Sequence, residues 1–206
     1  MQTTKAFGSS QIMIERREVK KENKFTTRPS IAFISRFAGG KTYYSNLLQK
    51  ELKALGIKTF RVSLAQKIKD VAFDVFGMKE KNRRLLQQLG AKMRDIDPNV
   101  WIKYLITNIK NENKLPFIID DLRFLNEASI FKENFNPFYI IKINSDSSKR
   151  FEIYKTLYGR YPTEEEINDP TETEIDEIKA DDTIINEYDP SMARNTIKII
   201  IDKYFK

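Results

Sequence analysis

Short apolar runs alternate with longer segments of helical periodicity along most of the chain. The runs SIAFIS, from Ser30, and LPFIIDDL, from Leu115, have the length of buried strands. Further strands are predicted at 59–64, 138–143 and 183–185. Apolar residues at helical spacing predict helices at 40–55, 65–76, 81–95, 99–111, 126–134, 146–158 and 193–204.

This alternation predicts an α/β fold with three α/β/α layers, a mainly parallel sheet of about five strands, and a helical lid at about 146–180. Ligands of such sheets bind beyond the carboxyl ends of the strands. Residues 1–28 lack a clear period, although 11–15 could form a short strand. We therefore expect an N-terminal extension at 1–28 and one domain at 29–206.

The segment from Ser35 to Thr42 resembles the phosphate-binding pattern G-x-x-x-x-G-K-[ST] between a strand and a helix. Its glycines allow backbone N–H groups to surround phosphates, and the helix that follows presents its N-terminus to the anion. Ser35 replaces the first glycine and is less suited to a positive φ. The alternative is a plain strand–turn–helix connection. The residues predicted to contact ATP are Ser35, Ala38, Gly39, Gly40, Lys41, Thr42 and Tyr43, and Thr42 is also a predicted Mg²⁺ ligand.

A second charged group follows the apolar strand at 115–122. Asp120, Asp121 and Arg123 should emerge at the ligand-binding edge of the sheet. Asp121 could hold Mg²⁺, and Arg123 could neutralise charge on a transferring phosphoryl group. In the alternative interpretation, Asp121 caps the next helix and Arg123 pairs with Glu127.

One face of the predicted helix at 81–95 carries arginine and glutamine. Such a face could bind a monophosphate through arginine and a base or sugar through glutamine, although it could equally be a solvated surface. Trp101 and Tyr104 are residue types found more often in a core than stacked on a base. The predicted substrate-binding residues are Ser63, Lys67, Arg84, Gln87, Arg94, Trp101 and Arg160.

A basic helix followed by an acidic, loop-like stretch is typical of a closing lid. Arg150 and Arg160 lie within the predicted helix or just after it, and the acidic residues follow at 163–174. A lid of this kind brings arginine to phosphates and excludes water. The alternative is a surface helical hairpin.

Composition narrows the chemistry. The 206 residues contain no histidine and no cysteine, which excludes Ser-His and Cys-His catalysis as well as thiolate metal sites. No stretch approaches the roughly 18 apolar residues of a membrane span, and the N-terminus is too polar for a secretory signal. The net charge of +7 suits an anionic partner or a merely basic surface. We expect a cytoplasmic protein.

Several ordered pieces resemble the deoxynucleoside monophosphate kinases of tailed bacteriophages, within the wider group of nucleoside monophosphate and phosphomevalonate kinases. The resemblance covers about residues 30–187. It consists of the loop at 35–42 and five further pieces. These are VSLA (62–65) with Lys67; RLLQ (84–87) with Gly90 and Arg94; ID (96–97) with VWI (100–102); DLRF (121–124) with Asn126 and Glu127; and Glu172 with Glu174, before the strand that ends in Asn186.

This resemblance implies a P-loop kinase fold, ATP with Mg²⁺, a deoxynucleoside 5′-monophosphate as acceptor, and a possible homodimer in the host-cell cytoplasm. Lys41 and Thr42 would serve ATP and Mg²⁺, whereas Arg84, Gln87, Arg94 and Arg123 would serve the acceptor. Two rival hypotheses remain at this stage. One is a nucleotide-binding regulator without efficient transfer, and the other is a DNA-binding ATPase, suggested by the positive charge.

Overall fold

A computed structural model describes residues 28–206. The possible strand at 11–15 and almost all of the predicted N-terminal extension lie outside these residues. The described chain forms a sheet of five parallel strands in the order β2-β3-β1-β4-β5, as the sequence predicts. The strands are β1 (Ser30–Ile34), β2 (Phe60–Val62), β3 (Phe117–Ile119), β4 (Phe138–Asn144) and β5 (Asp182–Ile185).

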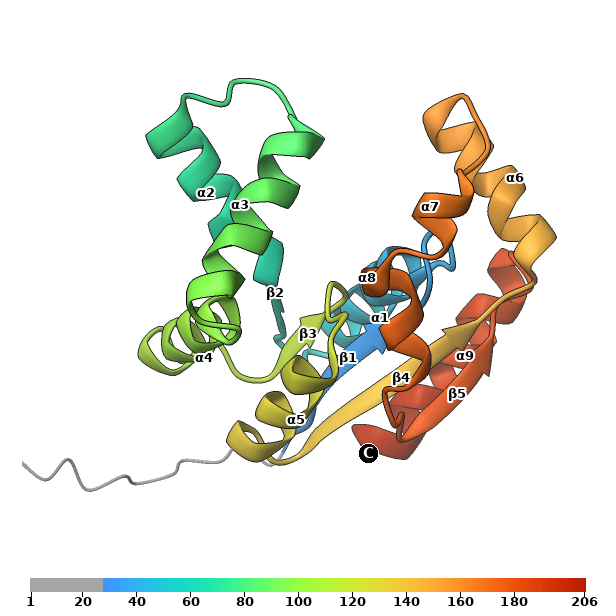
Figure 1. Ribbon diagram of the computed structural model, residues 1–206. Helices are drawn as coiled ribbons and strands as arrows, with labels where there is room; N and C mark the ends of the chain where they lie inside the picture. The colour runs from blue at the N-terminus through green and yellow to red at the C-terminus, as the bar shows by residue number, and fades with distance from the viewer. Residues whose placement is uncertain (1–27) are drawn as a thin grey trace, which may run out of the picture.

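Helices cover both faces of this sheet (Figure 1). Those in the first half of the chain are α1 (Lys41–Ala54), α2 (Leu64–Phe76), α3 (Arg83–Ile96) and α4 (Val100–Asn111). Those in the second half are α5 (Leu125–Asn134), α6 (Ser147–Tyr158), α7 (Glu164–Ile167), α8 (Pro170–Thr173), the short 3₁₀ helix η1 (Glu174–Asp176) and α9 (Pro190–Tyr204). Among the described residues, no helix is both long enough and apolar enough to cross a membrane.

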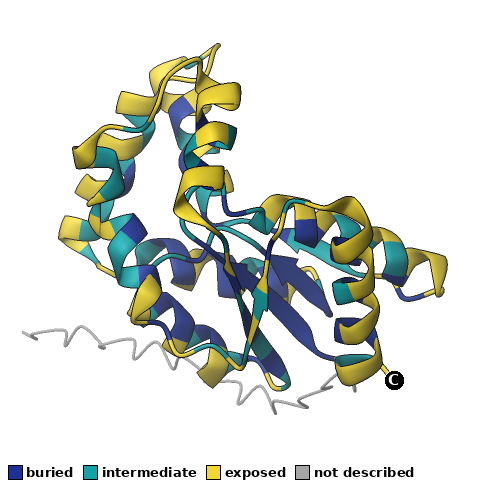
Figure 2. Ribbon diagram, turned by 90° about the vertical axis from the view of Figure 1, so that its right-hand side faces the viewer, coloured by how far each residue is buried: buried dark blue, intermediate teal, exposed yellow. Residues whose placement is uncertain are grey.

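The side chains of the central strand alternate between two cores. Ile31 and Phe33 pack with α1 and α9 on one face, whereas Ala32 and Ile34 pack with α4 and α5 on the other. All four side chains are fully buried. Burial on both faces is why the strand sequence is a continuous apolar run rather than an alternating one. Figure 2 shows this buried sheet between largely exposed outer helices.

Two helical units stand beyond the carboxyl edge of the sheet (Figure 1). The first is α2 with α3, which pack together and against α4. The second is the predicted lid, in which α6 is followed by α7 and α8. The acidic stretch at 163–174, expected to be loop-like, instead forms these two short helices and the start of η1. Its capping residues explain the difference, because Thr163 accepts from the Glu166 N–H and Asp169 accepts from the Thr171 N–H.

Candidate active site

The predicted phosphate loop, residues 35–42 (hereafter the phosphate loop), connects the central strand β1 to α1. The backbone turns through positive φ at Ala38 (54°) and Gly40 (97°), whereas Ser35 is not among the residues with positive φ. Serine at the position of the first glycine is therefore unstrained. The buried Ser35 side chain also fills the space beside Gly39, where an added Cβ would lie 2.8 Å from both Ser35 Cβ and Ser35 Oγ.

Lys41 is the first residue of α1, and its Nζ lies 3.4 Å from the Ser35 carbonyl oxygen. Burial and, secondarily, the charge of Arg123 lower the pKa of Lys41 to about 8, although Glu172 opposes this shift. An anion beside Lys41 would favour its charged form. The next two residues of α1, Thr42 and Tyr43, are exposed.

A buried carboxylate lies between the phosphate loop and Arg123. Glu172 of α8 accepts hydrogen bonds from the Phe37 N–H and from Arg123 Nη1, each at 2.5 Å. Arg123 also donates to the Thr171 carbonyl at 3.1 Å. Arg123 thus pairs with Glu172 and not with Glu127, the partner considered in the alternative interpretation of the sequence. It is held between the loop and the lid.

Asp121, predicted at the ligand-binding edge, caps α2. Its carboxylate accepts from the Leu64 N–H at 3.1 Å, the Ala65 N–H at 2.9 Å and Ser63 Oγ at 2.6 Å. Ser63 is therefore engaged with Asp121 and does not line the cavity described below. The neighbouring Asp120 forms an ion pair with Arg61 at 2.8 Å. Both carboxylates follow β3, as expected, but both already have protein partners.

Glu127 orders the start of α5 and approaches Arg94. Its buried carboxylate accepts from the Arg123 N–H at 2.9 Å and the Phe124 N–H at 3.2 Å. Arg94 Nη2 lies 3.6 Å from Glu127 Oε1, and its guanidinium lies 4.9 Å from the centre of the Phe124 ring. Burial raises the pKa of Glu127, against the opposing effect of these hydrogen bonds and Arg94. Arg94 is therefore held in place from α5.

A cavity of about 990 Å³ lies between α3, the loop after β3 and the lid. Gln87, Arg94, Arg123 and Arg160, four of the predicted site residues, line it together. The rest of the lining includes the apolar residues Phe37, Ile68, Leu86, Phe124 and Tyr154 and the acidic residues Asp95, Glu165, Glu166, Asp169 and Glu172. The cavity thus combines an apolar surface with cationic groups that converge from both helical units.

Three other predicted substrate contacts lie outside the cavity lining. Arg84 is exposed, and its neighbour Arg83 lines the cavity instead, because adjacent helical positions point about 100° apart. Trp101 is buried in the core, and its indole N–H donates to the Gly90 carbonyl at 3.2 Å. The Nζ of Lys67 lies 5.1 Å from the centre of the Tyr104 ring.

Glu166 of α7 joins the lid to α3. It accepts from both terminal nitrogens of Arg160 at 2.8 Å, from the Tyr154 hydroxyl at 2.9 Å and from Arg83 Nη1 at 3.3 Å. Hydrogen bonding from Arg160 is the main cause that lowers the pKa of Glu166 to about 2. This carboxylate therefore stays charged near neutral pH and connects the two sides of the cavity.

Arg150 lies on the phosphate loop rather than in the cavity. It is buried, and its guanidinium lies 5.3 Å from the ring centre of Phe37 and 5.9 Å from that of Phe151. Among the described residues, its buried Nη1 has no hydrogen-bond partner. Burial, followed by the charge of Arg36, lowers the pKa of Arg150. The arrangement leaves a donor available beside the loop.

In residues 28–206, no group of three or more histidine, cysteine, aspartate or glutamate side chains is placed to hold a metal ion. Mg²⁺ commonly requires only one or two protein oxygens beside substrate phosphates and water. The exposed Thr42 hydroxyl, at the second position of α1, fits that requirement.

No protein-family model and no curated protein sequence matches the chain. Solved structures do match. A sugar kinase from Janibacter aligns with a TM-score of 0.52 and 12% identity over 86% of this chain and 95% of that one. Shikimate kinase from Bacteroides thetaiotaomicron aligns with a TM-score of 0.50 and 11% identity over 84% and 96% of the two chains. The five-stranded α/β architecture is therefore similar in fold to these two kinases.

Proposed function

We propose that this protein transfers the γ-phosphoryl group of ATP to a deoxynucleoside 5′-monophosphate, giving ADP and a deoxynucleoside diphosphate. The cavity beside the phosphate loop is the observation that carries this proposal. Four arginines line it, namely Arg83, Arg94, Arg123 and Arg160, together with an apolar surface and Gln87. Arginine suits the phosphate of the acceptor, and the apolar surface suits its base.

The donor side would use the phosphate loop. Lys41 and the N–H groups at the start of α1 are suited to the β- and γ-phosphates of ATP. Thr42 would hold Mg²⁺ together with phosphate oxygens, and the ion would neutralise charge on those phosphates. Asp121, the other predicted ligand, accepts three hydrogen bonds as the α2 cap. We therefore assign it a contact through water at most.

Arg123 is suited to stabilise the group in transfer. It lies against Glu172, which also accepts from the phosphate-loop N–H of Phe37. A guanidinium held this close to the loop can neutralise charge that develops on the γ-phosphoryl oxygens. Arg150 and Arg160 would approach the phosphates from the lid, which excludes water that would otherwise hydrolyse ATP.

The contacts of the two strand-end carboxylates leave neither of them free to serve a hydroxyl acceptor as general base. A hydroxyl nucleophile is assisted by a general base within hydrogen-bonding reach. Asp121 is occupied by three hydrogen bonds and Asp120 by its ion pair with Arg61. A phosphate monoester already carries nucleophilic oxygens, so positioning and charge neutralisation suffice.

The test is incubation of the protein with ATP, Mg²⁺ and each of the four common deoxynucleoside monophosphates, followed by chromatography of the products. Modified pyrimidine monophosphates extend the screen. We expect equal amounts of ADP and one deoxynucleoside diphosphate. Tight ATP binding without a product from any acceptor would contradict transfer and favour a regulatory nucleotide-binding protein. ATP hydrolysis that depends on added DNA would favour a DNA-binding ATPase.

A further inference from the structure

Two side chains beyond β5 contact the backbone of the phosphate loop. Asn186 Nδ2 donates to the Gly39 carbonyl at 3.1 Å, and the Tyr188 hydroxyl donates to the Ala38 carbonyl at 2.9 Å. These partners are 147 and 150 residues apart in the chain. Neither side chain lines the cavity, and the proposed transfer assigns no role to either.

These two contacts fix the direction of two peptide groups. In a trans peptide, the carbonyl and the following N–H point in opposite directions. Holding the Gly39 carbonyl against Asn186 therefore directs the Gly40 N–H away from Asn186. The Gly39 N–H is used within the loop, where it donates to the Arg36 carbonyl at 3.2 Å.

The loop needs this support because it contains few glycines. Ala38 adopts a φ of 54°, a conformation that costs a residue with a side chain on the order of 1 kcal/mol and persists only where the surroundings enforce it. Gly40 allows the supporting residue to approach, because a Cβ at this position would lie 2.5 Å from Asn186 Nδ2. Loop and support thus fit each other closely.

The supporting segment is itself well anchored. The Asn186 N–H donates to the Asn144 carbonyl at 2.7 Å, which continues the pairing of β4 with β5. Asn186 Oδ1 accepts from the Tyr188 N–H at 2.9 Å, and the Asn186 side chain is buried. Burial raises the pKa of Tyr188, so its hydroxyl remains a donor at neutral pH. The segment connects the sheet directly to α9.

We propose that Asn186 and Tyr188 are positioning residues for the loop that binds the β- and γ-phosphates of ATP. Asn186 orients the Gly40 N–H for the phosphates, and Tyr188 holds the turn at Ala38 in which the Gly39 N–H donates to the Arg36 carbonyl. This inference rests on the proposed function, since it takes the loop as the triphosphate site. The two side chains act through the loop backbone, whereas Lys41 acts on the phosphates directly.

Inorganic tripolyphosphate is the probe of choice, because it carries the phosphates of ATP without a base or sugar. Tyr188→Phe keeps the ring and removes only the donor, and Asn186→Ala removes the second contact. We expect each variant to bind tripolyphosphate about threefold to tenfold more weakly by calorimetry, the effect of one lost orienting hydrogen bond. The KM for ATP should rise similarly, while the KM for the acceptor stays unchanged.

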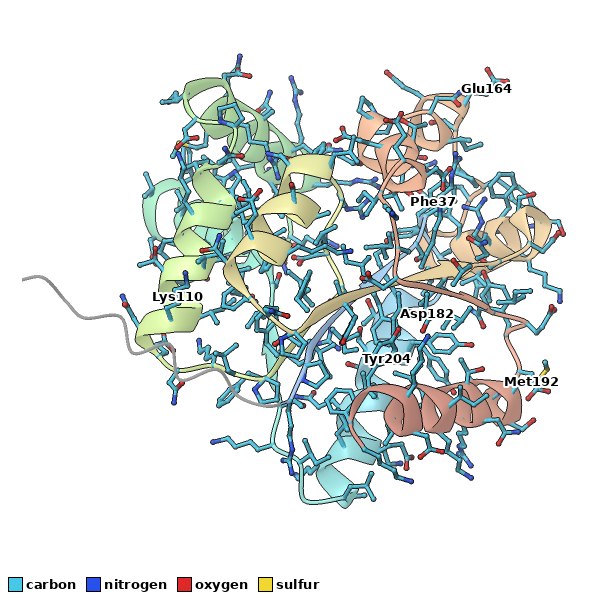
Figure 3. The ribbon with its side chains drawn as sticks, turned by 90° about the horizontal axis from the view of Figure 1, so that it is seen from below. Phe37, Lys110, Glu164, Asp182, Met192 and Tyr204 are labelled. Atoms are coloured by element: carbon cyan, nitrogen blue, oxygen red, sulfur yellow. The ribbon has the colours of Figure 1, made fainter. Side chains whose placement is uncertain are left out.

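Tyr204→Phe is the matched control, because it removes a tyrosine hydroxyl that donates to Asp182 at 2.5 Å. Figure 3 shows Tyr204 and Asp182 together beside α9, apart from the labelled Phe37 of the phosphate loop. An unchanged tripolyphosphate affinity in Tyr188→Phe would overturn the inference. This holds even if the KM for ATP rises, because that combination would mean that Tyr188 contacts the nucleoside part of ATP and does not act on the phosphates. An equal loss in Tyr204→Phe would overturn it as well.

The same measurements separate this inference from the proposed function. If wild-type protein binds tripolyphosphate and Lys41→Ala does not, the loop is a polyphosphate site. The Asn186→Ala and Tyr188→Phe variants then test only the positioning role. If wild-type protein binds neither tripolyphosphate nor ATP, both proposals are wrong. If it binds both but transfers no phosphoryl group, the transfer reaction is wrong and the positioning role still stands on the binding data.

Discussion

The two sides of the cavity are built in different ways. The phosphate loop follows the fully buried strand β1, and buried residues such as Glu172 and Asn186 hold its backbone. The opposite side consists of α3 and the part of the lid around α7, where partly exposed side chains such as Arg83, Arg160 and Glu166 form the contacts. Exposed ion pairs contribute little stability. In the proposed reaction, the donor side is therefore set by the core, whereas the acceptor side can adjust to its ligand.

Replacing Lys41, on the phosphate-loop side, should cause the largest loss of activity. Lys41→Ala removes the charge that the loop presents to phosphate, and we expect kcat/KM to fall by about a thousandfold. The measurement is the rate of ADP formation, with circular dichroism to confirm the fold. Lys50→Ala changes an exposed lysine on the same helix and should retain full activity. Comparable activity of the two variants would remove the loop from the mechanism.

Arg123 connects the two sides, and its loss should come next. We expect Arg123→Ala to lower kcat by about a hundredfold, because charge on the transferring group is no longer neutralised. The variant also leaves the buried Glu172 without its guanidinium partner and so costs stability. The double variant Arg123→Ala/Glu172→Gln should regain Tm but not turnover. Recovery of both would assign Arg123 a purely structural role. Arg194→Ala, on the exposed face of α9, is the control.

The lowered pKa of Lys41 predicts a pH dependence confined to the donor side. A lysine with a pKa of about 8 loses its charge above that pH, and phosphate binding then requires uptake of a proton. Tripolyphosphate affinity should fall by up to about tenfold per pH unit above this value. Calorimetry in buffers of different ionisation enthalpy measures the proton uptake. Lys41→Arg does not titrate in this range, so its profile should show only the ionisation of tripolyphosphate itself. A wild-type profile equal to that of Lys41→Arg would contradict the prediction.

On the acceptor side, a substitution at Gly90 should change the KM of the acceptor but not the KM for ATP. A Cβ at Gly90 would lie 3.3 Å from Arg94 Nη1 and 3.5 Å from Ile68 Cδ1. We expect Gly90→Ala to displace Arg94 and raise the KM of the acceptor by about fivefold, with the KM for ATP unchanged. Steady-state kinetics with each substrate varied in turn measures both values. Gln88→Ala, an exposed neighbour on α3, should change neither. A rise in the KM for ATP alone would mean that the cavity binds ATP and not the acceptor.

The smallest effect should come from Glu166. Its pKa is depressed from 4.5 to about 2, so its stabilising contribution is complete above about 4.5 and is lost as the pH falls toward 2. Because the ion pairs are exposed, we expect Glu166→Gln to lower Tm by about 2 °C or less at neutral pH. The difference should vanish near pH 2. Thermal unfolding across this range measures it, and a difference that grows in acid would have the wrong sign.

The sequence predicted the fold well, because strands buried on both faces are continuous apolar runs and the helices between them have clear periods. It also predicted that Gln87, Arg94, Arg123 and Arg160 would share one site, and all four line the cavity. The roles of these residues remain predictions. The order of the strands follows from packing rather than from any local pattern.

The differences between the predicted contacts and the cavity lining have two physical causes. A shift of one residue in a helix changes the face by about 100°, which is why Arg83 rather than Arg84 lines the cavity. Contacts across long stretches of chain also leave no local signal. Glu172, which binds the Phe37 N–H 135 residues earlier, lies in an acidic stretch whose composition indicates only polarity. Asp121 was placed at the correct edge, but its partners belong to α2.

The contact between Gly39 and Asn186 also joins a segment that is synthesised early to one that is synthesised late. The segment that carries the phosphate loop leaves the ribosome 147 residues before the side chain that secures it. A nascent chain that ends before β5 contains the whole phosphate-binding sequence but lacks the segment that anchors it. In the proposed function, nucleotide binding thus depends on completion of the edge strand, and a truncated chain carries the motif without the finished loop.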